Sequence, residues 1–150
     1  MSEIILPWEY SRWFFYFGFI SLGSAIYAFT REYYDLGFGP LGVGINTINY
    51  WRKPDYSCRR YIDICWVCIT LVYQCLRAIE SSKRILFYSV LFPSLFSFIP
   101  GVYFFKREKL GISTFFHSIV HIGGNISNCI LYSSDLPYIP LNVCMLTIVV

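Results

Sequence analysis

Residues 13–30 read WFFYFGFISLGSAIYAFT and contain no charged side chain. As an α-helix, this stretch would be about 27 Å long, close to the thickness of the hydrocarbon core of a bilayer. Trp8 and Trp13 lie at one end of the stretch, and Tyr33 and Tyr34 follow the other. Aromatic side chains are enriched at both membrane interfaces. We therefore predict a transmembrane helix here.

Four more apolar stretches follow, separated by short polar loops, and they cover residues 36–49, 62–76, 85–105 and 112–132. The first is rich in glycine around Pro40, so it is either a short, closely packed span or a re-entrant segment. The third contains Pro93 and Pro100 and is expected to be kinked. Residues 141–150 are also apolar but are too few to span a bilayer. The pattern predicts an all-α, polytopic transmembrane bundle of about five spans, forming one integral membrane domain over residues 1–150.

The composition supports the same class. Hydrophobic residues make up 56% of the chain and charged residues 14%, whereas soluble domains carry about 25% charged residues. This excludes a soluble globular domain and a disordered chain. The net charge of +3 comes with no long basic block, so no nucleic-acid partner is expected. The expected partners are the lipid bilayer and other membrane subunits or a second copy of the chain.

Basic residues are unevenly distributed between the predicted loops. With five spans, eight of the 12 Lys and Arg residues lie on the side that carries loops 50–60 and 106–109, and four lie on the other. Because cytoplasmic loops carry the excess of Lys and Arg, both loops are predicted to be cytoplasmic. The sequence does not identify the organelle.

Ionisable side chains inside apolar stretches mark candidate functional sites in membrane proteins. Asp63, His117 and His121 are predicted to lie at a similar depth, and the two histidines, four residues apart, share one helical face. This arrangement suits a shared metal ion such as zinc, with Asp63 as the third ligand. Nearby polar residues extend the candidate cluster: Asn46, Asn49, Ser118 and Asn125.

The alternative interpretation of these residues is structural. Histidines in membrane helices often hydrogen-bond between helices and stabilise their packing. Asp63 can pair with Arg59 or Arg60 at the level of the lipid headgroups.

The loop after the second stretch combines aromatic and basic residues: Tyr50, Trp51, Arg52, Lys53, Arg59 and Arg60. Aromatic side chains at the interface and cations facing phosphates are typical of a lipid-headgroup site. The favoured interpretation of the same composition is a loop that only fixes the orientation of the chain in the membrane.

These residues form a longer pattern: Asn49-Tyr50-Trp51-Arg52-x-Pro54, then Arg59-Arg60-x-x-Asp63, then His117-x-x-x-His121-x-x-x-Asn125. Over residues 45–133 the pattern resembles that of small multi-span membrane proteins from protists and large DNA viruses, a likeness that implies no activity. Through His117-x-x-x-His121 alone, the chain also resembles the alkaline-ceramidase-like membrane hydrolases. In those seven-span proteins three histidines hold zinc, with a serine and an aspartate nearby. Here the third histidine and two spans are missing.

Three functions are compatible with these features. The favoured one is a structural or assembly role in a membrane or membrane complex, without enzymatic activity. The second is a metal-dependent lipid hydrolase in which Asp63, His117 and His121 hold zinc and activate a water molecule. The third is a proton-coupled carrier that uses the histidine pair and the glycine-rich stretch.

Overall fold

The computed structural model describes residues 4–137 and 139 and confirms the all-α fold within them. Its helices are α1 (Trp8–Thr30), α2 (Tyr34–Trp51), α3 (Cys58–Ala78), α4 (Arg84–Phe96), α5 (Phe98–Lys106) and α6 (Leu110–Tyr132). Each of the five predicted apolar stretches therefore becomes helical. The apolar segment 141–150 lies outside the described residues.

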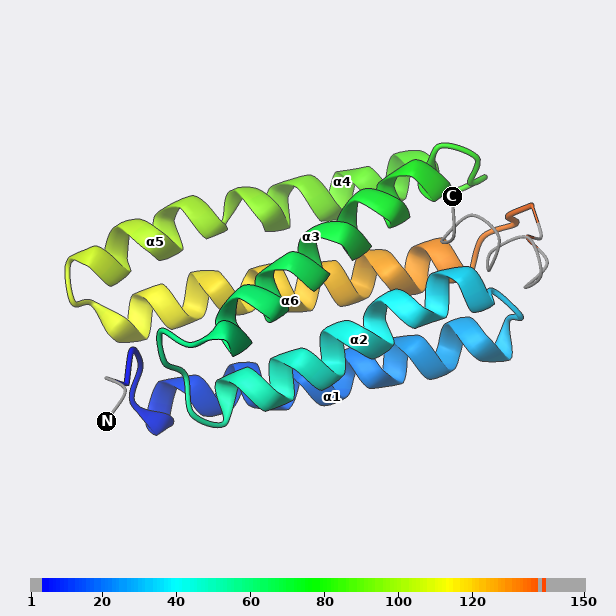
Figure 1. Ribbon diagram of the computed structural model, residues 1–150. Coiled ribbons are helices and arrows are strands. Elements are labelled where there is room, and N and C mark those ends of the chain that lie inside the picture. Colours follow the sequence, from blue (N-terminus) through cyan, green and yellow to red (C-terminus); the bar gives the residue numbers. More distant parts are fainter. Residues whose placement is uncertain (1–3, 138, 140–150) are drawn as a thin grey trace.

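The helices form an elongated bundle (Figure 1). α1 and α2 pack side by side, α6 contacts α1, and α4 and α5 cover α6. α4 and α5 form one interrupted rod over Arg84–Lys106. The interruption falls at Ser97, between Pro93 and Pro100, where a kink was expected because proline cannot donate the helical hydrogen bond. α3 packs on α2 and crosses the bundle obliquely.

The glycine-rich stretch is a continuous helix. α2 includes Pro40 and runs for 18 residues alongside α1. Its glycines allow a close approach: a Cβ added at Gly44 would lie only 2.8 Å from the carbonyl oxygen of Gly18 on α1. Small residues at helix contacts serve this purpose in membrane proteins.

The polarity of the bundle is the reverse of that of a soluble protein. Among the described residues, 30 large hydrophobic side chains are exposed, whereas 17 polar or charged residues are buried. α3 shows this most clearly, because Asp63, Gln74 and Arg77 are buried while Ile69 and Val72 on the opposite face are exposed. Burying polar groups is costly unless they are paired, and exposing apolar ones is costly in water. The distribution therefore fits an apolar solvent.

Three helical segments of the described chain are long and apolar enough to cross a membrane: Trp8–Thr30, Cys58–Ala78 and Arg84–Lys106. The sequence predicted five spans. The two others, α2 and α6, are long but more polar. For example, α6 contains His117, His121, Asn125 and Asn128.

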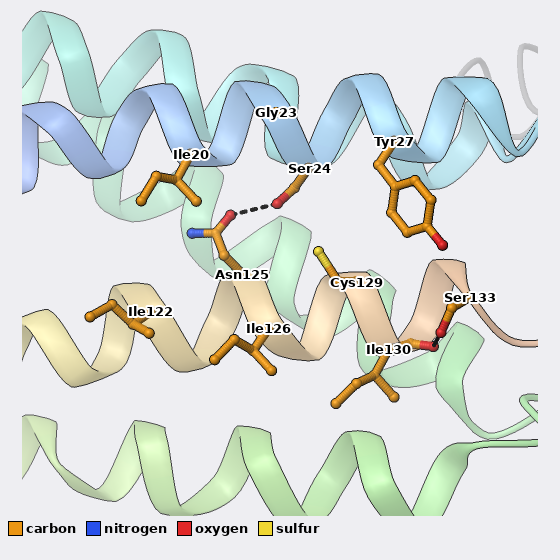
Figure 2. Close-up of a pocket in the computed structure, with 10 residues that line it drawn as sticks. All are labelled: Ile20, Gly23, Ser24, Tyr27, Ile122, Asn125, Ile126, Cys129, Ile130 and Ser133. Carbon is orange, nitrogen blue, oxygen red and sulfur yellow. Dashed lines mark hydrogen bonds between the residues drawn. The ribbon is translucent and has the colours of Figure 1, made fainter.

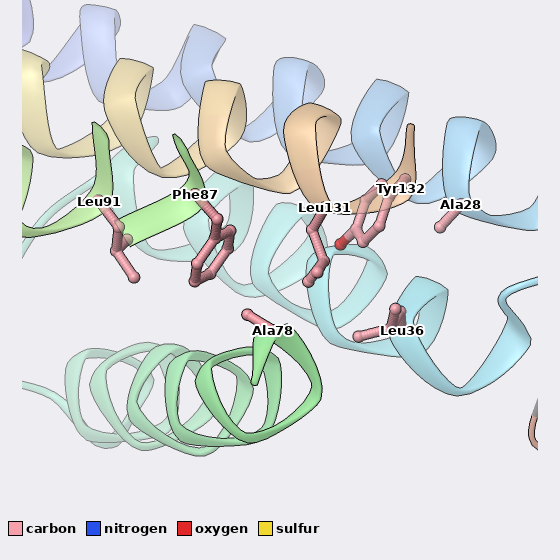
Figure 3. Packing of buried hydrophobic residues seen from close by; sticks show 7 residues of the cluster. All are labelled: Ala28, Leu36, Ala78, Phe87, Leu91, Leu131 and Tyr132. Atoms are coloured by element: carbon pink, nitrogen blue, oxygen red, sulfur yellow. The ribbon is translucent and has the colours of Figure 1, made fainter. Parts of the chain in front are cut away.

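The largest cluster of buried apolar side chains lies where α1 and α6 end and α2 and α4 begin (Figure 3). We call this end of the bundle the Tyr132 end. The opposite end, which contains the two histidines, is the His117 end. The cluster draws on α1, α2, α3, α4 and α6 and consists of Ala28, Leu36, Ala78, Phe87, Leu91, Leu131 and Tyr132.

Candidate functional site

The two histidines lie together on one face of α6, as their spacing predicted. The rings of His117 and His121 are 5.2 Å apart and stacked within 12° of parallel. Both also contact the ring of Phe14 on α1, at centroid distances of 4.5 and 5.5 Å. No described residue hydrogen-bonds to either imidazole. The pair is therefore held by aromatic packing.

Aromatic side chains from three helices surround His117. The ring centroids of Trp51 on α2 and Phe98 on α5 lie 5.7 and 5.6 Å from that of His117, while Phe14 completes the group from α1. Aromatic pairs at these distances contribute about 0.5–1.5 kcal/mol beyond the burial of their area. The histidines thus help to join α1, α2, α5 and α6 at this end of the bundle.

Asp63 belongs to a different contact. It is buried on α3, and its carboxylate accepts a hydrogen bond of 3.0 Å from the hydroxyl of Thr47 on α2. Within the described residues, no group of three His, Cys, Asp or Glu side chains is placed to hold a metal ion. The structure therefore does not bring Asp63, His117 and His121 together as the predicted ligand set. Sequence reasoning missed Thr47, because nothing in the sequence shows which face of α2 meets α3.

The other members of the predicted polar cluster are also dispersed. Asn125 on α6 pairs with α1, where its side-chain oxygen accepts a 2.7 Å hydrogen bond from Ser24. Asn49 is exposed and contributes only its backbone oxygen, to Arg59. Asn46 and Ser118 are half-buried on separate helices. These residues were predicted to lie at a similar depth in the membrane. They do not form one cluster, because their side chains face different helices.

The loop between α2 and α3 is organised around Arg59. Its guanidinium donates to the Asp55 carboxylate and to the backbone oxygen of Lys53, both at 2.9 Å, and to the backbone oxygen of Asn49 at 3.1 Å. Ser57 also hydrogen-bonds Asp55. Arg59 therefore stabilises the loop, and neither Asp63 nor a lipid phosphate is needed as its partner.

The remaining residues of this loop divide into exposed and buried groups. Tyr50 was predicted to lie at the interface, but it is buried and makes an edge contact with Trp51. Arg52 and Lys53 are exposed, and Arg60 lies over the ring of Tyr56. A headgroup site here would therefore lack Tyr50 and would consist of the basic side chains together with the exposed ring of Tyr56.

The strongest buried electrostatic contact lies at the Tyr132 end, and the sequence did not predict it. Arg77 on α3 forms an ion pair with Asp35 on α2, with 3.0 Å between Nε and Oδ2. Both side chains are more than nine-tenths buried. The hydroxyl of Tyr73 donates to the same carboxylate oxygen at 2.8 Å.

Further contacts complete this network. The guanidinium of Arg77 also contacts Glu80 at 2.7 Å and donates to the backbone oxygen of Pro137 at 2.7 Å. One turn earlier on α3, the amide of Gln74 donates to the hydroxyl of Tyr132 at 2.8 Å. These bonds tie α3 to α2, α6 and the segment after α6. The available signal was the spacing of Gln74 and Arg77, which lie three residues apart in the mostly apolar second half of α3.

Comparisons with family models, curated proteins and solved structures found no match for this chain. Its function is therefore argued from the arrangement described above.

Proposed function

We propose that this chain is a small multi-pass membrane protein with a structural or assembly role in a membrane or membrane complex. In this proposal five helical segments cross the bilayer: α1, α2, α3, the rod formed by α4 and α5, and α6. The observation that carries the proposal is the reversed polarity of the bundle, since apolar side chains face outward while most of the buried polar side chains form hydrogen bonds or ion pairs inside. In lipid, polar groups must be satisfied within the protein.

The contacts of the buried polar groups support a structural role. They join helices to one another through hydrogen bonds and an ion pair: Thr47–Asp63, Ser24–Asn125, Ser113–Gly101, Gln74–Tyr132 and Asp35–Arg77. Side-chain hydrogen bonds of this kind hold membrane helices together. The metal-dependent hydrolase is less well supported, because its three proposed ligands do not converge.

The alternation of the rods supports the proposed orientation. The loop after α2, the loop after α5 and the start of α1 all lie at the His117 end. Eight of the 12 Lys and Arg residues belong to these segments at the His117 end of the bundle. By the positive-inside rule, loops 50–60 and 106–109 face the cytoplasm in this proposal.

The topology is tested by labelling single cysteines in intact membranes. In a variant without the native cysteines, Lys53→Cys and Lys109→Cys are expected to react from one side of the membrane, and Lys83→Cys from the other. A membrane-impermeant maleimide is the reagent. Labelling of Lys53→Cys and Lys83→Cys from the same side would reject five spans.

The assembly role is tested by crosslinking in native membranes, followed by mass spectrometry and native gels. We expect the chain in a species larger than the 17.6 kDa monomer, containing further copies or other membrane subunits. A chain that stays monomeric both in membranes and in mild detergent would reject the assembly role.

A further inference from the structure

A groove of about 690 Å³ runs between α1 and α6 on the outer surface of the bundle (Figure 2). Its lining includes four isoleucines, Ile20, Ile122, Ile126 and Ile130, together with Gly23 and Asn125. A Cβ added at Gly23 would meet no atom within 4 Å. The glycine therefore leaves space that no neighbouring helix uses.

The groove extends over only half the length of the helices. It begins at Ile20 and Ile122, near the midpoints of α1 and α6, and reaches Ser133 just after α6 ends. The helical rise from Ile122 to Ser133 is about 16 Å. The hydrocarbon core of a bilayer is about 30 Å thick, so the groove matches one leaflet. An acyl chain has this reach, whereas a partner's spanning helix would need a groove along the whole bundle.

The polar groups on the groove floor do not oppose an apolar occupant. Ser24 donates a 2.7 Å hydrogen bond to the side-chain oxygen of Asn125, and the Asn125 amide donates to the backbone oxygen of His121 at 2.8 Å. Paired polar groups lose little when water is excluded, unlike unpaired ones. An acyl chain can therefore cover them at low cost.

Two cations stand where the groove opens at the Tyr132 end. Arg31 Nε donates to the backbone oxygen of Tyr132 at 3.3 Å, and Lys83 Nζ donates to the oxygen atoms of Ser133 at 3.1 Å. Arginine carries five N–H donors, and the described residues accept from only one of those of Arg31. The remaining donors suit a phosphate group.

Carboxylates accompany these cations at the same end. Glu32 follows Arg31 in the chain, and Asp135 lies two residues after Ser133. Nearby positive and negative groups complement a headgroup that has both a phosphate and an ammonium group. They fit a zwitterionic headgroup better than a purely anionic one.

We propose that this groove binds one acyl chain of a zwitterionic glycerophospholipid, with the lipid phosphate at Arg31 and Lys83. This inference rests on the proposed function, because it requires the chain to be embedded in a bilayer. It adds a specific lipid-binding site, which is separate from the basic loop at the His117 end.

The groove is tested by filling it. Full-length protein in mild detergent is titrated with a phosphatidylcholine, and retained lipid is counted by native mass spectrometry. We expect saturation at one tightly retained lipid per chain. Gly23→Leu should weaken this binding at least about tenfold, because its side chain occupies the space of the acyl chain. Gly124→Leu is the matched control, since Gly124 is also open but does not line the groove.

The phosphate contacts are tested with a second lipid. Diacylglycerol has the same acyl chains without the phosphate, and we expect wild-type protein to bind it about tenfold more weakly, as the loss of a charge-assisted hydrogen bond predicts. The double variant Arg31→Gln/Lys83→Gln should lower phosphatidylcholine binding to the level of diacylglycerol. Arg84→Gln, an exposed cation at the same end, should have no effect.

Several outcomes would overturn the inference. Equal lipid binding by Gly23→Leu and Gly124→Leu would remove the groove as the site. A change in oligomeric mass in Gly23→Leu, without loss of lipid, would assign the groove to a protein partner. Circular dichroism checks that each variant is helical. Resistance to carbonate extraction separates the two proposals: an embedded chain without retained lipid refutes this inference alone, whereas an extracted chain refutes the proposed function.

Discussion

The contact between α1 and α2 gives the sharpest test of the fold, through the substitution Gly44→Ala. Gly44 faces Gly18 so closely that an added Cβ would lie 2.8 Å from the Gly18 carbonyl oxygen and 2.6 Å from Leu22 Cδ2. The leucine side chain can rotate away from the new methyl group. The carbonyl oxygen is part of the α1 backbone and cannot, so the two helices must separate.

The size of the effect follows from this geometry. Ordinary contacts of a Cβ begin near 3.4 Å, so the helices must separate by about 0.6 Å at this point. A gap of this size loses about a quarter to a half of the dispersion energy of the atoms affected. Inserting an extra methyl group into a packed contact costs about 1–3 kcal/mol, and the better helix propensity of alanine offsets up to about 1 kcal/mol. We expect a net loss of about 1–2 kcal/mol.

Unfolding in bicelles, followed by steric trapping or SDS titration, measures this free energy. Gly23→Ala is the matched control, because it makes the same change on α1 where a Cβ would meet nothing within 4 Å. It should leave stability unchanged or raise it by up to about 1 kcal/mol. Gly18→Ala, on the other side of the contact, should behave like Gly44→Ala.

If Gly44→Ala and Gly23→Ala have the same free energy of unfolding, the close approach of α1 and α2 is not present in the membrane. The reasoning from the backbone contact would then be refuted. A larger loss in Gly23→Ala than in Gly44→Ala would contradict it even more directly.

The remaining predictions concern the buried charges and the histidines. Arg77→Met should destabilise the protein by about 3–5 kcal/mol in the same unfolding assay, because it leaves Asp35 buried without its cation. Adding Asp35→Asn should recover part of this loss, and strictly additive effects would show that the pair is not coupled. His117→Phe should keep stability within about 1.5 kcal/mol of wild type, whereas His117→Ala should lose about 1–3 kcal/mol through the cavity it leaves; equal losses would argue against a packing role. Elemental analysis of purified protein should find no stoichiometric zinc, and one zinc per chain that disappears in a His117→Ala/His121→Ala variant would restore the hydrolase hypothesis.

The helices were predictable because their signal is local. Apolar runs set the approximate bounds of all five helical segments, and the interruption at Ser97 follows from the flanking prolines. The i, i+4 spacing of His117 and His121 correctly placed both on one face. Helical geometry alone fixes such relations, because neighbouring turns repeat every 3.6 residues.

Partners across helices were not predictable in the same way. Asp63 pairs with Thr47 and not with the histidines, and Arg77 is buried against Asp35. Each of these outcomes depends on the rotation of one helix about its axis relative to the next. Close contacts of small residues set that rotation, such as those of Gly39 with Thr70 and Gly42 with Trp66 between α2 and α3.

Local features were enough to predict that this chain is helical and too apolar for a soluble fold, because hydrogen bonding along each helix and the number of apolar residues do not depend on distant contacts. The meeting of particular polar side chains, the separation of the predicted metal ligands and the groove between α1 and α6 became known only from the fold. Those features depend on distances between helices far apart in sequence, which packing of the whole bundle sets.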